Sequence, residues 1–129
     1  MPENVGKDQI RRVAVLYLRK FEAERDAFLK LLQQSAETIP KKPLFLRIVL
    51  FQALTDASEA KELIARVTQA KAVAVLGFTE GLPAAKQREL NTAFSKPGRM
   101  FRALAAADAG KKSVTIDIIV ELMLLPPES

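Results

Sequence analysis

The chain has 129 residues, of which 49% are apolar and 27% charged, and its formal net charge is +5 at pH 7. A chain of this length suits one domain with a single core. Because it contains no cysteine and no histidine, thiol chemistry, disulfides, imidazole catalysis and the usual nitrogen and sulfur metal sites are excluded. We therefore expect one domain over 1–129, with neither a metal nor a resident cofactor.

The start of the chain is polar and shows no secretory signal, and no apolar run approaches the roughly 18 residues that indicate a membrane span. We expect a cytoplasmic domain without a membrane span. The tail stops abruptly after an apolar run, which also fits a domain cut from a longer protein.

The first two elements differ in the pattern of their apolar residues. Residues 11–18 form a short run rich in β-branched and large apolar side chains, which is typical of a strand buried on both faces. Residues 21–37 instead place Phe28, Leu31 and their neighbours at three- and four-residue spacing, with charged side chains between them. We expect a strand followed by an amphipathic helix.

The same alternation continues. Residues 42–51 are expected to form the second strand, and residues 55–70 a helix whose N-cap is Thr55, Asp56 or Ser58. Arg47, the one charged side chain among residues 43–51, either snorkels to the sheet edge or binds an anion.

The third strand is predicted at 71–78, with Gly77 at its carboxyl end, where the chain turns outward. A helical region in two pieces, 83–96 and 99–110, is expected to follow, because Pro83 is tolerated in a first helical turn and Pro97 with Gly98 interrupts the pattern.

The last apolar run, 113–122, alternates, which predicts a fourth strand. Five apolar side chains would share one face of it: Val114, Ile116, Ile118, Val120 and Leu122.

Strands that alternate with helices predict a four-stranded parallel sheet with helices on both faces, a small flavodoxin-like α/β fold. Ligands of such sheets bind beyond the carboxyl ends of the strands, which nominates the loops 19–24, 52–57 and 77–84. None of them contains a dinucleotide-binding or P-loop motif. The alternative is an all-α bundle, because short apolar runs also occur in buried helices.

The order of elements resembles that of the Toll/interleukin receptor (TIR) domain, bacterial type. The opening VAVLYLRKFEAERDAFLKLL has the strand, polar loop and helix of that family, with Asp26 and Phe28 as its acidic and aromatic pair. The stretch LIARVTQAKAVAVLGFTEGLPAAKQREL reproduces its helix, strand, loop and Glu-Leu pair. The resemblance covers about residues 11–120 and implies a TIR-like signalling or effector domain.

In the TIR domains that cleave NAD, the essential glutamate occupies the Glu-Leu position, so the resemblance implies Glu89 as the catalytic carboxylate and NAD as a substrate. A carboxylate beside the ribose would stabilise an oxocarbenium-like centre or activate water. The sequence departs from the family where Ala85 and Lys86 replace a common Trp-Cys pair. The simpler interpretation makes Glu89 a solvent-facing residue that pairs with Lys86 or Arg88.

The nucleotide is expected to lie against the loops after the first and third strands. We expect its contacts to come from Arg19, Phe21, Gly77, Phe78 and Thr79. For Arg19 and Phe21, the simpler interpretation is a loop at a strand end with one aromatic ring packed inward.

Two other functions remain open. The same fold can act as a non-catalytic interaction module that self-associates or recruits another TIR-like domain. Alternatively, the chain is a small basic helical DNA-binding protein. This hypothesis rests on residues 82–113, which carry seven basic and two acidic side chains. The stretch 95–125 faintly resembles a helix-turn-helix with Gly98 at the turn.

Overall fold

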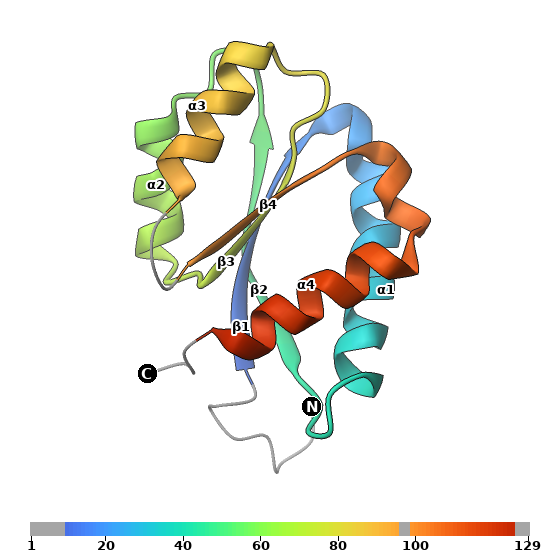
Figure 1. The fold of residues 1–129 in the computed structure, drawn as a ribbon. Coiled ribbons are helices and arrows are strands. Elements are labelled where there is room, and N and C mark those ends of the chain that lie inside the picture. The colour runs from blue at the N-terminus through green and yellow to red at the C-terminus, as the bar shows by residue number, and fades with distance from the viewer. Residues whose placement is uncertain (1–9, 96–98, 126–129) are drawn as a thin grey trace.

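The structure is a computed structural model that describes residues 10–95 and 99–125 (Figure 1). Strands, α-helices and 3₁₀ helices (η) follow one another as β1 (Ile10–Leu18), η2 (Arg19–Phe21), α1 (Glu22–Thr38), β2 (Phe45–Leu54), α2 (Ala60–Gln69), β3 (Ala74–Phe78), α3 (Ala84–Phe94), β4 (Met100–Leu104), η3 (Ala106–Gly110) and α4 (Lys112–Leu124).

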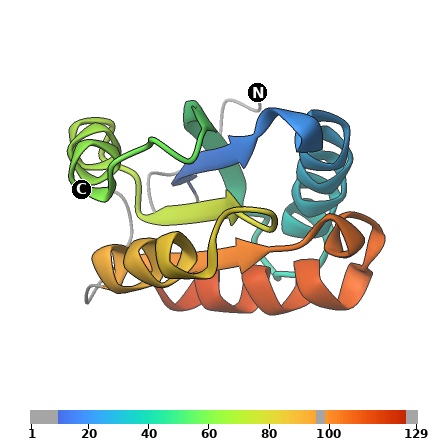
Figure 2. The ribbon, with the colours of Figure 1, turned by 90° about the horizontal axis from the view of Figure 1, so that it is seen from above.

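The four strands form one parallel sheet in the order β2-β1-β3-β4. Helices α1 and α4 pack on one face, and α2 and α3 pack on the other (Figures 1 and 2). The predicted parallel α/β fold is therefore confirmed, and the all-α alternative is wrong. The chain reverses its winding direction between β1 and β3, and the carboxyl ends of these two strands define the topological switch point.

The first three strands and helices lie close to their predicted positions. All five residues of β3 are buried, as expected for a central strand covered on both faces. Helix α2 begins later than predicted, at Ala60, and Glu59 precedes it without a side-chain cap. Thr55 and Ser58 instead close a turn, in which the Thr55 N–H donates to Ser58 Oγ at 2.9 Å.

The prediction of a strand at 113–122 is wrong, because this segment lies within helix α4. Its buried residues follow a spacing of three and four, which is the period of a helix, and they are Thr115, Ile118, Ile119 and Leu122. Alternation also placed Ile116 and Val120 inside, but both are exposed. Ile118 and Leu122 fit both periods, since they alternate with Ile116 and also keep the helical spacing, and packing against α1 and the sheet selects the helical period.

The fourth strand instead comes from a segment predicted as helical. Met100 and Leu104 of β4 are buried on the α1/α4 face of the sheet, and Phe101 packs on the opposite face. The Phe101 ring stacks on Phe94 with 5.3 Å between the ring centroids. This strand has only five residues, which is too short for its alternation to stand out among the neighbouring alanines.

The core has one apolar layer on each face of the sheet. The α1/α4 layer is centred on Phe28, whose ring meets Phe78 edge to face at 5.8 Å. It includes one buried polar contact, in which the hydroxyls of Ser35 and Thr115 lie 3.2 Å apart. This hydrogen bond joins α1 to α4 where a lone hydroxyl would be costly.

Candidate functional site

The carboxyl edge of the sheet holds the loops that the sequence nominated. The 3₁₀ helix η2 follows β1, and the loop that leads to α3 follows β3 on the next strand of the sheet. In this loop, Gly81 has φ = +103°, a conformation that favours glycine. The two loops therefore meet at the switch point.

Lys20 occupies this meeting point. A Cβ added to Gly81 would lie only 2.6 Å from Lys20 Nζ and 3.4 Å from a methyl group of Leu18. Lys20 Nζ also lies 5.1 Å from the centroid of the Phe21 ring. Because Gly81 has no side chain, the ammonium group rests against the backbone of the β3–α3 loop and brings a positive charge to the switch point.

A small pocket of about 260 Å³ opens beside this point, between the ends of β3 and β4. Its two acidic side chains accept hydrogen bonds from backbone amides. Glu80 accepts a hydrogen bond from the Ala106 N–H at 3.2 Å, and Asp108 accepts one from the Ala105 N–H at 2.9 Å. These two carboxylates hold the loop after β4. The lining residues are Thr79, Glu80, Gln87, Ala103, Leu104, Ala105 and Asp108.

Of the expected nucleotide contacts, Thr79 lines this pocket, and Arg19 is exposed on η2, next to Lys20 in the sequence. Gly77 and Phe78 lie in the sheet below the loops and are fully buried. A Cβ on Gly77 would approach Thr79 and Phe101 to 3.2 and 3.3 Å, so this glycine makes room for packing. Their roles in binding stay predictions.

Phe21 is partly buried and packs against the α1/α4 layer of the core, in line with the simpler interpretation of the loop after β1. Its ring lies under the Lys20 ammonium group. It therefore positions η2, whatever else it contacts.

Glu89 lies apart from the pocket. Its carboxylate is 3.1 Å from Lys86 Nζ, and its side chain is 51% exposed. Lys86 also donates to the Ser58 carbonyl at 2.8 Å, which turns this ion pair toward the start of α2. Gln87, two residues before Glu89 and on the other side of α3, lines the pocket instead. The expected pairing of Glu89 with Lys86 is confirmed, and its catalytic role stays a prediction.

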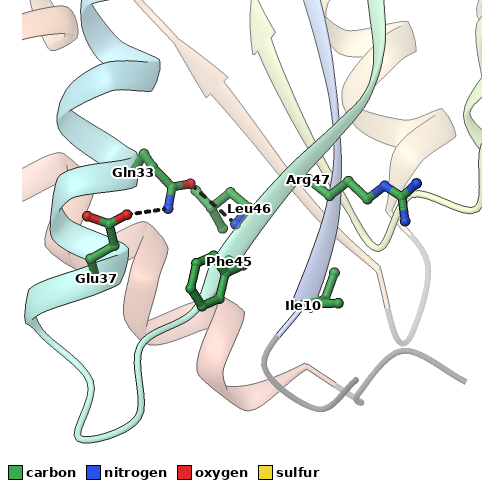
Figure 3. A pocket seen from close by; sticks show the side chains of 6 residues that line it. All are labelled: Ile10, Gln33, Glu37, Phe45, Leu46 and Arg47. Atoms are coloured by element: carbon green, nitrogen blue, oxygen red, sulfur yellow. Dashed lines mark hydrogen bonds between the residues drawn. The ribbon is translucent and has the colours of Figure 1, made fainter. Parts of the chain in front are cut away.

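A larger depression, of about 700 Å³, lies at the other end of the sheet (Figure 3). Gln33 and Glu37 on α1 face Phe45 and Leu46 on β2, and Gln33 Oε1 accepts the Leu46 N–H at 3.3 Å. This bond caps an amide of the edge strand, a device that limits edge-to-edge pairing. Ile10 and Arg47 also line this depression, and the exposed Arg47 side chain extends away from Gln33 and Glu37 (Figure 3).

Edge strand β2 also carries Phe51, which is 49% exposed. The Arg25 guanidinium lies 5.0 Å from the Phe51 ring centroid and 4.3 Å from that of Tyr17. Partial burial lowers the pKa of Arg25, but the hydrogen bond and charge of Asp26 raise it, and the net pKa lies above its ordinary value. A permanent cation thus covers this part of the edge.

Helix α4 carries most of the exposed large apolar side chains among the described residues. Four of their six exposed large apolar side chains belong to this helix. They form a surface that we call the α4 face, which consists of Ile116, Val120, Met123 and Leu124, with exposed fractions of 37%, 47%, 45% and 81%.

The α4 face continues into a groove of about 550 Å³ between α4 and the α1–β2 loop, which we call the basal groove. Its charged side chains are all basic. The groove is lined by Arg11, Ile39, Pro40, Lys41, Lys42, Leu44, Val120 and Met123. The Arg11 Nε–H is committed to the Leu122 carbonyl at 2.9 Å, so Lys41 and Lys42 form the open rim.

The basic segment 82–113 does not form one surface. Lys86 and Arg88 lie on α3, Arg102 pairs with Glu121 of α4 at 3.5 Å, and Arg99 donates to Thr68 at 3.3 Å. The helix-turn-helix interpretation is wrong for this fold, since 100–104 is a strand; its proposed turn residue, Gly98, lies outside the described residues.

Within residues 10–95 and 99–125, no group of acidic side chains is arranged to hold a metal ion. No helix in this part of the chain is long and apolar enough to cross a membrane. No protein-family model matches the sequence, and a search of curated proteins finds no match.

Proposed function

We propose that this protein is an interaction module that self-associates through the α4 face. The observation that carries the proposal is the row of exposed apolar side chains on one side of α4, continuous with the basal groove. Scattered apolar residues are normal on a protein surface, whereas a contiguous set indicates an interaction site. The proposal does not depend on the TIR resemblance. It is compatible with that resemblance, because a non-catalytic TIR-like module is also expected to self-associate.

Sedimentation velocity tests this function over about 1 μM to about 1 mM, the range of weak and moderate assembly. The wild-type chain is expected to increase in mass with concentration. Val120→Lys places a charge in the centre of the α4 face and is expected to weaken assembly at least about tenfold. Thr92→Lys, which adds the same charge to an exposed position of α3, is the matched control. A wild-type chain that stays monomeric throughout would refute self-association.

A second candidate is nucleotide binding at the switch point, which the position of Lys20 against Gly81 favours. An ammonium group held at the carboxyl edge of a parallel sheet suits a phosphate-bearing ligand. The proposed NAD cleavage would need Glu89 to reach that ligand from α3, and its present partner is Lys86.

Nicotinamide release, measured at the highest concentration at which the chain assembles, tests the enzymatic version. Glu89→Gln keeps the size of the side chain and is expected to abolish release, whereas Lys20→Ala is expected to weaken NAD binding. The variant Arg88→Gln is the control, because it changes an exposed neighbour on the same helix. Release that is unchanged in Glu89→Gln would remove Glu89 from the reaction.

A further inference from the structure

The apolar residues of the α4 face have the spacing of a helix that contacts another helix. Ile116, Val120 and Met123 follow at intervals of four and three residues, so they form a narrow stripe along α4. This stripe lies about 120° around the helix from the centre of the buried side, which includes Ile118 and Leu122. A partner helix laid along the stripe would cover all three exposed side chains.

The two sides of the stripe differ in charge. On one side, Val120 and Met123 line the basal groove together with Lys41 and Lys42. On the other side, helical spacing puts Asp117 and Glu121, which lie about 60° and 100° around the helix from Val120. Glu121 meets Arg102 at 3.5 Å, whereas Asp117 makes no ion pair with any described residue.

This asymmetry selects one symmetric pairing of two α4 helices. If the helices were antiparallel, a two-fold axis would bring the acidic sides of both copies together, and both lysine pairs as well. If the helices are parallel, the acidic side of each copy faces the lysines of the other. Opposite charges then meet on both sides of an apolar stripe, an arrangement that parallel coiled coils also use.

We propose that two copies of this chain pair through α4 with parallel helices about a two-fold axis, so that Asp117 of each copy faces Lys41 and Lys42 of the other. The inference rests on the proposed self-association and specifies its geometry. A two-fold interface uses the same surface on both copies and is closed. The assembly is therefore a dimer and does not grow into a filament.

Single cysteines test the orientation cleanly, because the natural chain has none. In the parallel pair, residue 116 faces residue 116, and residue 123 faces residue 123. Ile116→Cys and Met123→Cys are therefore each expected to form a disulfide dimer on mild oxidation with diamide. Thr92→Cys, exposed on α3, is the control and is expected to stay monomeric at the same concentration.

An antiparallel pair cannot crosslink at both positions. The two positions lie seven residues apart, or about 10 Å along the helix. In any antiparallel register, at least one of them is therefore about 10 Å or more from its counterpart, beyond the Cα separation of about 7 Å that a disulfide tolerates. Crosslinking at only one position, or at neither while the wild type dimerises, would overturn the proposed pairing.

Charge reversal tests the contact between copies. Asp117→Lys and the double variant Lys41→Glu/Lys42→Glu are each expected to weaken dimerisation about tenfold or more, because like charges then face one another. Mixed in equal amounts, the two variants are expected to recover wild-type affinity as a heterodimer, in which opposite charges meet on both sides. A mixture no stronger than its components would overturn the contact.

The outcomes also separate this inference from the function on which it rests. A chain that remains monomeric fails the proposed function itself. If the chain assembles into species larger than a dimer, or dimerises equally well after charge reversal, the proposed self-association stands and the parallel pairing of α4 is rejected. Unchanged assembly in Val120→Lys would show that another surface mediates contact, and would reject the α4 pairing.

Discussion

Three isoleucines of α4 provide a stringent test of the helix that replaced the predicted strand. Ile118 and Ile119 are fully buried, and Ile116 is 37% exposed. Truncation of a fully buried isoleucine to alanine costs about 2–5 kcal/mol, since transfer free energy is lost and a cavity remains. We expect a loss of about 3 kcal/mol of unfolding free energy for Ile118→Ala and for Ile119→Ala.

The same substitution at Ile116 is the matched control. The Ile116 side chain is 37% exposed and loses only part of the packing that a fully buried isoleucine loses, and alanine has a higher helix propensity than isoleucine, by a few tenths of a kcal/mol. We therefore expect Ile116→Ala to cost about 1 kcal/mol, well below the loss at the two buried positions. Its larger effect should appear in dimerisation.

Urea denaturation followed by circular dichroism measures these differences. With a slope of about 2 kcal/mol per M, a loss of 3 kcal/mol lowers the midpoint by about 1.5 M. The protein should be kept near 1 μM or below, so that self-association does not add to the apparent stability.

A strand over this segment would give a different result. Ile116 and Ile118 would then share one face and Ile119 the other, because side chains alternate across a strand. Equal losses at Ile116 and Ile118, with little change at Ile119, would refute the helical assignment of α4. A large loss at Ile118 and Ile119 alone is what the structure requires.

Three further predictions concern the carboxyl edge and can be checked in the same assay. Gly77→Ala is expected to cost about 1–3 kcal/mol, because its Cβ would press on two packed side chains, whereas Gly110→Ala meets nothing within 4 Å and should stay within about 0.5 kcal/mol of wild type. Asp108→Ala is expected to cost about 1 kcal/mol and to speed hydrogen exchange of the Ala105 amide, which loses its acceptor; unchanged exchange would contradict the role of this carboxylate. Glu89→Gln should leave the midpoint unchanged, since an exposed ion pair contributes little, and a clear loss would give Glu89 a structural role instead.

Much of the fold follows from local sequence pattern. The runs that became β1 and β3 are apolar on both faces, and α1 and α2 repeat their apolar residues every three or four positions. Such patterns are imposed by burial of one helix face or two sheet faces, and they predict element type without knowledge of neighbours. The loops at the carboxyl edge followed from the parallel sheet itself.

The prediction failed where two periods fit the same residues. The segment 113–122 alternates well enough for a strand, and its residues 115, 118, 119 and 122 also form a helical stripe. Only the neighbours resolve the ambiguity: α1 and the sheet bury the helical set, and the place beside β3 is taken by the five residues of β4.

The candidate site was only partly accessible to sequence reasoning for a similar reason. Thr79 follows a buried strand, so its position at the edge could be predicted. The contact between Lys20 and Gly81 depends on which strands are neighbours in the sheet, and no local pattern encodes that order. The single available signal was a glycine in the polar loop after β3.

The sequence by itself therefore determined the class of fold. Short runs that are apolar on both faces alternate with segments that have one apolar helical face, and this pattern leaves few alternatives to a parallel α/β sheet. It also determined which chemistry is absent, because no cysteine or histidine is present. Tertiary structure alone decided that 113–122 is a helix and that Ile116, Val120 and Met123 remain uncovered. Each of these depends on contacts between segments distant in the chain, and hydrophobic periodicity specifies that a face must be buried without specifying what covers it.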